Sequence, residues 1–336
     1  MKNTLLGQTG VKVSQLCFGV MSFGGDAPPD VCEVMYRRCR EAGINFFDCA
    51  DVYAGGRSEE ILGQLIARER DEVIITSKAY FPTNKSDINA RGASRHHLML
   101  ACEASLKRLN TDYIDLYFIH RFDENTDLHE TLRALDDLVS QGKIISCGAS
   151  NFAAWQVAKA LGISAREGFA KFCCIQPMYN LVKRIAEVEL LPMAQSENLG
   201  VIPYSPLGGG LLTGKYASGG GEGRLRENTM YEKRYGAEQV HDVARCFTEF
   251  AQEHGYAPAS LAVAWVGAHP AVTAPIIGAR NPTQLEDSLN SLQIDMTEEL
   301  YGAISSLSPA PPPATDRSEE RESGDPTAMV IKAARY

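Results

Sequence analysis

Residues 45–53 read Asn45-Phe46-Phe47-Asp48-Cys49-Ala50-Asp51-Val52-Tyr53, and this stretch decides how the rest of the chain is interpreted. An apolar run from Ile44 to Phe47 ends in a carboxylate, and a tyrosine follows five positions later. A run of this length, preceded by a helix-like segment and by Gly43, predicts a buried strand of an α/β protein. An acidic residue at the end of such a strand predicts a functional group.

The same arrangement recurs twice downstream. The run 73–77 is followed directly by Lys78, and the run 114–119 is followed directly by His120. Asp, Tyr, Lys and His are the side chains that donate, accept or stabilise a proton in enzymes. Their position at strand ends therefore predicts a proton-transfer site. Asp51 and Asp115 receive no role from this pattern and are interpreted as structural.

Strand-like and helix-like segments alternate over most of the chain. After a predicted hairpin at residues 3–13, the expected strands are 16–19, 44–47, 73–77, 114–119, 144–149, 173–175, 200–203 and 274–277. Helices are expected at about 30–43, 94–109, 128–139 and 155–161, and a further helix follows Asp48. About eight β/α units predict an α/β fold of the (β/α)8 barrel type, in which active sites lie at the carboxyl ends of the strands.

A doubly wound nucleotide-binding sheet is the alternative fold. It requires a G-x-G-x-x-G turn directly after the first strand, and residues 19–25 lack that spacing. A second glycine cluster at 219–223 follows no strand and is interpreted as a flexible loop. It belongs to an insertion, residues 213–238, that extends the loop after the seventh strand. We expect one domain at 1–308 and a Pro-rich, charged tail at 309–336.

Composition excludes several classes of function. The net charge of -9 in 336 residues argues against general nucleic-acid binding. Nine cysteines without CxxC spacing predict neither a disulfide framework nor a zinc site, and they favour a reducing, cytoplasmic location. No apolar run is long enough to cross a membrane, and no cluster has the spacing of a catalytic metal site. The sequence leaves open whether the chain forms a homo-oligomer.

The motifs, taken in order, resemble those of the aldo-keto reductases. Asp48-x-Ala50-x-x-Tyr53, Lys78 and His120 match the catalytic tetrad of that superfamily, and the resemblance covers roughly residues 5–307. Later motifs also match in order, namely 148–151, Gln176, 204–211 and 276–280. Within the superfamily the chain is similar to bacterial members and to potassium-channel β-subunit relatives. The resemblance implies a barrel enzyme that reduces aldehydes or ketones with a nicotinamide cofactor.

The resemblance gives each tetrad residue a role with a physical basis. Hydride delivery to a carbonyl carbon builds negative charge on its oxygen, which requires a proton donor. Tyr53 is the expected donor, and Lys78 is expected to lower its pKa by stabilising the anion. Asp48 would hold Lys78 charged and in place, and His120 would hydrogen-bond the substrate oxygen. A purely structural Asp48–Lys78 pair is the plainer alternative.

The resemblance also implies which residues bind the cofactor. Ser150, Asn151 and Gln176 match the positions that bind the nicotinamide carboxamide, and Tyr204 matches the residue that stacks on its ring. The remaining cofactor positions are Gly19, Met21, Ser205, Pro206, Leu207, Gly209, Lys215, Ile277, Gly278, Arg280, Gln284, Asp287 and Ser288. At the adenosine end, this chain has Asp287-Ser288 where many relatives have Glu-Asn.

The resulting expectation is an NADP(H)-dependent reductase that acts on a small carbonyl substrate, with Arg280 selecting the 2'-phosphate. The insertion 213–238 would close over the cofactor. Two alternatives from other classes stay open. One is a nicotinamide-binding regulatory module with slow turnover, and the other is a lyase that forms a Schiff base at Lys78. The sequence does not identify the carbonyl substrate.

Overall fold

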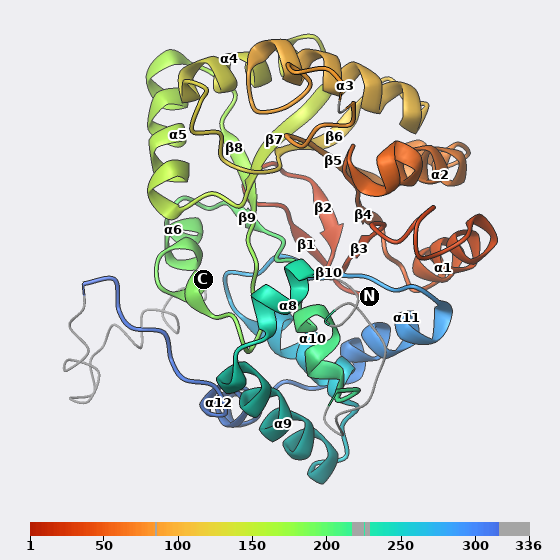
Figure 1. The fold of residues 1–336 in the computed structure, drawn as a ribbon, viewed down its shortest axis with the longest axis vertical. Coiled ribbons are helices and arrows are strands. Elements are labelled where there is room, and N and C mark those ends of the chain that lie inside the picture. Colours follow the sequence, from red (N-terminus) through yellow and green to blue (C-terminus); the bar gives the residue numbers. More distant parts are fainter. Residues whose placement is uncertain (85, 217–224, 226–228, 316–336) are drawn as a thin grey trace.

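Eight parallel strands form a barrel in the computed structural model, which describes residues 1–84, 86–216, 225 and 229–315 (Figure 1). The strands are β3 (Cys17–Gly19), β4 (Phe46–Asp48), β5 (Ile74–Ala79), β6 (Ile114–Ile119), β7 (Ile144–Ser150), β8 (Phe172–Gln176), β9 (Gly200–Val201) and β10 (Ile276–Ile277). Each of them overlaps one of the strands expected from the sequence.

The sheet closes on itself. Neighbouring strands pair in the order β10-β3-β4-β5-β6-β7-β8-β9, and every pair is parallel. The gap between β9 and β10 is bridged by backbone hydrogen bonds, because Thr273 N–H donates to the carbonyl of Val201 at 2.8 Å and Ile276 N–H to that of Pro203 at 2.9 Å. The predicted (β/α)8 barrel is thus confirmed.

Apolar side chains on both faces explain why the strands read as almost unbroken apolar runs. Phe46, Leu116 and Phe118 belong to the cluster that fills the barrel interior. Their strand neighbours Phe47 and Tyr117 point the other way and belong to the larger cluster under the surrounding helices. The two-residue period of a strand therefore sends alternate residues of one run into two different cores.

Helices surround the barrel, as Figure 1 shows. They are α1 (Pro29–Glu41), α2 (Arg57–Ile66), α3 (Arg95–Leu109), α4 (Leu128–Ser140), α5 (Ala154–Glu167), α6 (Leu190–Ser196), α8 (Thr229–Tyr235), α9 (Glu238–Glu253), α10 (Pro258–Ala268), α11 (Pro282–Leu289) and α12 (Glu298–Ser306). Helix α5 runs beyond the expected 155–161 because its left-handed C-cap is Gly168. Within the described residues, no helix combines the length and apolarity that crossing a membrane requires.

The insertion at 213–238 differs from the expected loop. Helix α8 lies inside it, and Tyr231 of this helix packs against Gly209, where an added Cβ would come within 2.7 Å of the tyrosine ring. The glycine cluster at 219–223 lies outside the described residues. At the other end of the chain, α12 stops at Ser306, and residues 309–315 form neither helix nor strand. The charged run at 316–322 also lies outside the described residues.

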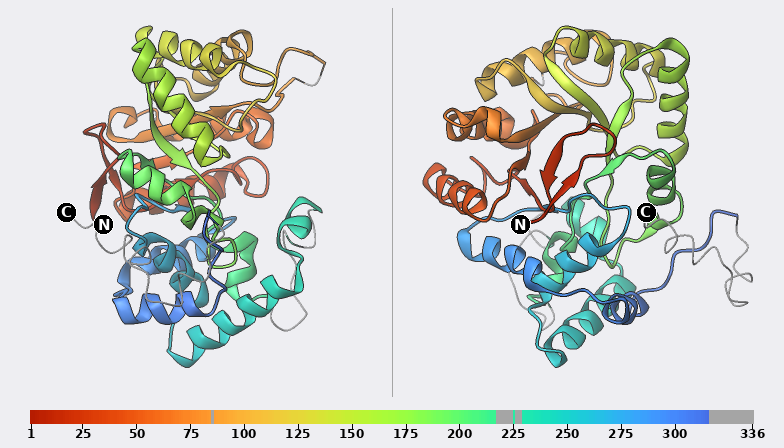
Figure 2. Two further views of the ribbon diagram at one scale, coloured as in Figure 1. Left: turned by 90° about the vertical axis from the view of Figure 1, so that its left-hand side faces the viewer. Right: turned by 180° about the vertical axis from the view of Figure 1, so that it is seen from behind.

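The predicted N-terminal hairpin, β1 (Asn3–Leu5) and β2 (Lys12–Ser14), covers the end of the barrel where the strands begin (Figure 2, right). Its turn contains Gly7 with φ 55°. A Cβ at Gly7 would lie 2.8 Å from the carbonyl oxygen of Cys173 and from the amide nitrogen of Gly200, near the starts of β8 and β9. Glycine is required there by the backbone angle and by the close approach.

Two substitutions in this one turn separate the two requirements. Gly10 also has positive φ, 76°, but an added Cβ would meet nothing within 4 Å. Gly7→Ala and Gly10→Ala both force alanine into the left-handed region, which should lower the free energy of unfolding by about 1–2 kcal/mol in each case. Only Gly7→Ala also places a methyl group too close to its neighbours. This overpacking should lower the free energy of unfolding by about a further 1–3 kcal/mol. We expect a melting temperature about 2–6 °C lower for Gly7→Ala than for Gly10→Ala by thermal denaturation; equal values would show that the close contact contributes nothing.

Candidate active site

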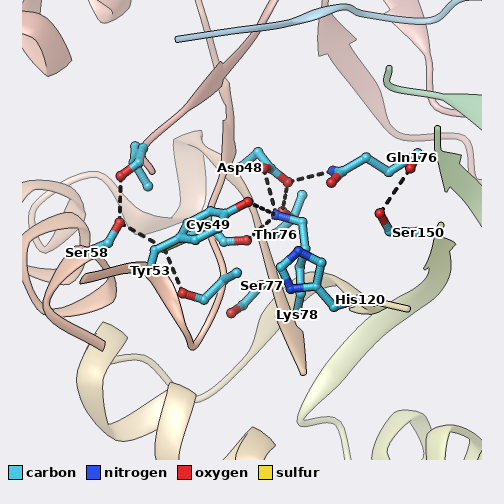
Figure 3. A network of polar contacts seen from close by, with 12 residues as sticks. Asp48, Cys49, Tyr53, Ser58, Thr76, Ser77, Lys78, His120, Ser150 and Gln176 are labelled. Carbon is cyan, nitrogen blue, oxygen red and sulfur yellow. Dashed lines mark hydrogen bonds and ion pairs between the residues drawn. The ribbon is translucent and has the colours of Figure 1, made fainter. Parts of the chain in front are cut away.

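The four predicted catalytic residues meet at the carboxyl ends of β4, β5 and β6 (Figure 3). Asp48 ends β4, Lys78 is the second-last residue of β5, and His120 follows β6. Tyr53 begins the short 3₁₀ helix η1 (Tyr53–Gly56). The Lys78 ammonium lies between the other groups: its Nζ is 2.7 Å from Asp48 Oδ2 and 3.3 Å from the Tyr53 hydroxyl oxygen.

The Asp48–Lys78 pair is buried, and both side chains make further hydrogen bonds besides the ion pair. Lys78 is 0% exposed and also donates to the carbonyl oxygen of Cys49 at 2.6 Å. The second oxygen of Asp48 accepts from Thr76 Oγ1 at 2.6 Å and from Gln176 Nε2 at 2.8 Å. Buried charges are tolerated only with such pairing, because leaving water costs several kcal/mol per ion. Residues on or next to three strands, β4, β5 and β8, therefore hold one ammonium group in place.

The electrostatics of Lys78 and Tyr53 follow from this burial. Burial by itself lowers the pKa of Lys78, but the charge of Asp48 and its hydrogen bond oppose this effect, and the net pKa is raised, so that the ammonium form persists. Burial raises the pKa of Tyr53 to about 12, although Lys78 lowers it as expected from the sequence. The expectation of a net lowered pKa was wrong, because burial outweighs the charge. Tyr53 therefore holds its proton at neutral pH, as an acid must.

His120 lies beside Tyr53 with its ring uncharged. The centres of the His120 and Tyr53 rings are 6.0 Å apart, edge to face, and the ring of Phe81 also lies edge to face with the imidazole, at 5.1 Å. Burial, followed by the charge of Lys78, lowers the pKa of His120 to about 3. Its Nδ1 has no hydrogen-bond partner within the described part of the chain. A neutral imidazole still carries one ring N–H, which can donate to a substrate oxygen while Tyr53 supplies the proton.

The residues predicted to hold the nicotinamide join the tetrad through hydrogen bonds. Asn151, with φ 57°, donates from Nδ2 to the carbonyl oxygen of His120 at 2.9 Å. The Tyr204 hydroxyl donates to Asn151 Oδ1 at 2.7 Å, and Ser150 Oγ donates to the carbonyl oxygen of Gln176 at 3.0 Å. The structure thus brings all four residues to the same edge of the barrel as the tetrad.

The predicted pyrophosphate loop is a glycine turn after β9. Ser205 has φ 60°, and Gly208, Gly209 and Gly210 are all left-handed at the start of the 3₁₀ helix η4 (Gly208–Thr213). Gly208 N–H donates to the carbonyl oxygen of Ser205 and Gly210 N–H to that of Leu207, both at 2.9 Å, so the turn is tight and has no side chains that would keep a ligand from its backbone. Asn180 fixes the turn by donating from Nδ2 to the carbonyl oxygen of Ser205 at 2.8 Å.

The other members of this predicted set surround the turn. Pro206 is buried and Leu207 is half-buried. The amine of Lys215 lies 4.8 Å from the ring centre of Tyr216, and its side chain approaches Gly210. A lysine at this place brings positive charge beside the glycine turn.

The predicted adenosine residues follow β10 and spread over the surface. Gly278 is exposed, and Arg280 Nε forms an ion pair with Asp26 Oδ2 at 3.0 Å. Arg280 N–H donates to Gln284 Oε1 at 3.0 Å, which ties the two residues together. Ser288 is buried instead, and its hydroxyl donates to the carbonyl oxygen of Gln284 within α11.

The remaining predicted contacts lie at strand ends or on the same helix. Gly19 ends β3, where an added Cβ would come within 2.8 Å of Ile276, and Met21 follows it with 38% of its surface exposed. Ile277 is the buried last residue of β10. Asp287 is exposed, and its backbone carbonyl accepts from Ser260.

Three residues of the site were missed by sequence reasoning. Thr76 had a usable signal, because it lies two positions before Lys78 on the same face of a strand. Asn180 and Asp26 had none, since their partners Ser205 and Arg280 are distant in sequence and meet them only in the folded chain.

Comparisons with known proteins identify relatives along nearly the whole chain. The model of the Aldo/keto reductase family matches residues 15–309. An uncharacterized oxidoreductase, YrpG, of Bacillus subtilis (strain 168) is 36% identical over 324 residues, which is 93% of this chain and 97% of that protein. A probable voltage-gated potassium channel subunit beta of Oryza sativa subsp. japonica is 34% identical, covering 93% and 98%. Versiconal hemiacetal acetate reductase of Aspergillus parasiticus is 32% identical, covering 89% and 94%.

The lowered pKa of His120 has a consequence for stability. A histidine whose folded pKa is about 3, against about 6.5 in the unfolded chain, stabilises the fold above pH 6.5. That stability is lost as pH falls from about 6.5 through about 3. We expect His120→Asn to lessen the loss of melting temperature on acidification from about pH 6.5 to 4. Thermal melts would compare this variant with wild type and with His96→Asn, a control at an exposed position. If the melting temperatures of His120→Asn and wild type differed by the same amount across this pH range, the expectation would be contradicted.

Proposed function

The chain belongs to the aldo/keto reductase family, and we propose that it reduces an aldehyde or ketone to the alcohol with NADP(H), using Tyr53 as the proton donor. Membership makes the chain an oxidoreductase, and relatives that are named as reductases support carbonyl reduction. The observation that carries the assignment of Tyr53 is its distance from Lys78. The tyrosine hydroxyl lies 3.3 Å from an ammonium that Asp48 holds in place.

The chemistry follows from these positions. When bound, a reduced nicotinamide would supply hydride to the carbonyl carbon, and negative charge would then develop on the carbonyl oxygen. Tyr53 gives its proton to that oxygen, and the ammonium of Lys78 stabilises the tyrosinate that remains. His120 donates a hydrogen bond to the same oxygen through its neutral ring. Phe81, packed on His120, supplies an apolar wall beside the reacting carbonyl.

The residues present fit a nicotinamide dinucleotide. Asn151 and Gln176 carry amide groups suited to its carboxamide, and Tyr204 offers an aromatic ring. The left-handed glycines Gly208, Gly209 and Gly210 have no side chains that would keep a pyrophosphate from the backbone, and Lys215 adds positive charge. We further propose that the segment 213–238 closes over the cofactor, since its helix α8 already packs against this turn through Tyr231.

The geometry weighs against one alternative. A Schiff-base lyase requires a free amine, whereas Asp48 raises the pKa of Lys78 and keeps it an ammonium. The regulatory alternative shares the tetrad and the cofactor turn with the reductase. Steady-state turnover with a panel of carbonyl compounds, with NADPH and with NADH, separates the two functions and identifies the substrate class.

Tyr53→Phe tests the assignment of the proton donor. The change removes one hydroxyl and leaves the predicted cofactor contacts intact. We expect carbonyl reduction to fall by about 10²–10⁴-fold, because that is what a well-placed acid contributes. Cofactor affinity, followed by fluorescence titration, should stay within about twofold of wild type.

Tyr113→Phe serves as the control, because Tyr113 precedes β6 at the opposite end of the barrel, where its hydroxyl donates to Asp71. Near-normal turnover by Tyr53→Phe would refute the role of Tyr53 as proton donor.

Arg280 and Asp26 together are expected to set the choice of cofactor. The guanidinium of Arg280 can bind a 2'-phosphate through charge-assisted hydrogen bonds worth roughly 1.5–3 kcal/mol, so NADPH should bind about tenfold to a hundredfold better than NADH. Asp26 competes for the same guanidinium. In titrations of both cofactors, Arg280→Ala should lose the preference and Asp26→Asn should increase it. Equal weakening of NADPH and NADH by Arg280→Ala would show that Arg280 does not bind the phosphate.

A further inference from the structure

A second buried polar cluster lies behind the tetrad, on the outer side of β5. Thr76 and Lys78 point into the barrel, so Ser77 between them points outward. Ser77 Oγ donates to Glu59 Oε1 at 2.5 Å, and Glu59, in the first turn of α2, is 0% exposed. Its other oxygen accepts from Arg108 Nε of α3 at 2.7 Å. One carboxylate therefore joins β5, α2 and α3.

This cluster supports the turn that carries Tyr53. The side chain of Arg108 packs against Gly56 at the end of η1, where an added Cβ would lie 2.8 Å from Arg108 Cδ. The turn is strained, because Ala54 has φ 46° within it. A non-glycine residue in this region costs roughly 1–2 kcal/mol and persists only when its surroundings hold it. Arg108 packs against this strained turn, and Glu59 holds Arg108 in place.

Asp51, on the same turn, connects the cluster to the active site. Its N–H donates to the carbonyl oxygen of Lys78 at 3.2 Å. Its carboxyl is 1% exposed, and neither oxygen has a hydrogen-bond partner within the described residues. Burial, followed by the charge of Glu59, raises the pKa of Asp51 to about 8, while Arg108 and Lys78 lower it. The raised pKa favours the protonated form of Asp51, and the ion pair of this cluster is the one between Glu59 and Arg108.

We propose that Glu59 and Arg108 are positioning residues that fix the turn from Tyr53 to Gly56 and so keep the Tyr53 hydroxyl in contact with Lys78. The inference rests on the proposed role of Tyr53 as proton donor. Neither residue of the pair touches the reacting groups. Their effect is on alignment, and a displacement of about 1 Å in a reacting group can lower a rate about a hundredfold.

Glu59→Gln tests the proposal, since it keeps the shape of the side chain and removes the charge that binds Arg108. We expect single-turnover carbonyl reduction at saturating cofactor to fall about tenfold to a hundredfold. Cofactor affinity should stay within about twofold, because the contacts proposed for the cofactor lie on other strands.

Asp115→Asn is the matched control. Asp115 pairs with Arg70 at 2.8 Å and accepts from Ile75 N–H, near the start of β6 and far from His120 along the strand. It should lower the melting temperature while leaving the rate within about twofold. A rate loss in Glu59→Gln no larger than in this control would overturn the proposal.

A second measurement does not depend on catalysis. Hydrogen exchange in peptides covering residues 49–57 should be faster in Glu59→Gln than in wild type, and unchanged in Asp115→Asn. Unchanged exchange in Glu59→Gln would overturn the positioning role, whether or not the protein reduces carbonyl compounds. Absence of carbonyl reduction by the wild type would instead overturn the proposed function alone.

Ser77→Ala replaces Glu59→Gln if the latter does not fold, because it removes only the link between Glu59 and β5. We expect a smaller effect in the same direction, about threefold to tenfold on the rate, with faster exchange at 49–57. An unchanged rate together with unchanged exchange would overturn the proposal here too.

Discussion

The ammonium of Lys78, held without contact to water by Asp48, is the group on which the rest of the site depends. An unpaired charge at this depth would destabilise the fold by several kcal/mol, so the barrel must supply partners from several strands at once. The carbonyl oxygen of Cys49 accepts from Lys78, and Thr76 and Gln176 donate to Asp48. The same contacts hold Lys78 at the position from which it can stabilise the anion of Tyr53. The contacts that offset the burial of the Lys78 charge are thus the same contacts that place it beside Tyr53.

Sequence reasoning succeeded where local rules decide the outcome. Strands buried on both faces read as apolar runs, and polar residues directly after them fall at one end of a parallel barrel, which placed Asp48, Lys78 and His120 correctly. It failed where packing between distant segments decides. Helix α8 forms in a glycine-containing insertion because Tyr231 packs against Gly209. The net direction of the pKa of Tyr53 was missed as well, since burial cannot be read from the residue type.

The two layers of polar contacts around β5 show how one strand serves two purposes. Thr76 and Lys78 act inside the barrel, while Ser77 between them contacts Glu59 outside it. Relatives named as reductases and as channel subunits share the family, so a barrel of this type supports more than one biological role.

The protonation state of Lys78 tests the central claim most directly. ¹⁵N NMR of protein labelled at lysine, with the Lys78 signal assigned by its absence in Lys78→Met, reports whether the group is an ammonium or an amine. The account predicts an ammonium from about pH 6 to about 10 in the wild type, and a pKa lowered by several units in Asp48→Asn, where burial acts without the opposing charge. A neutral amine at neutral pH in the wild type would contradict it.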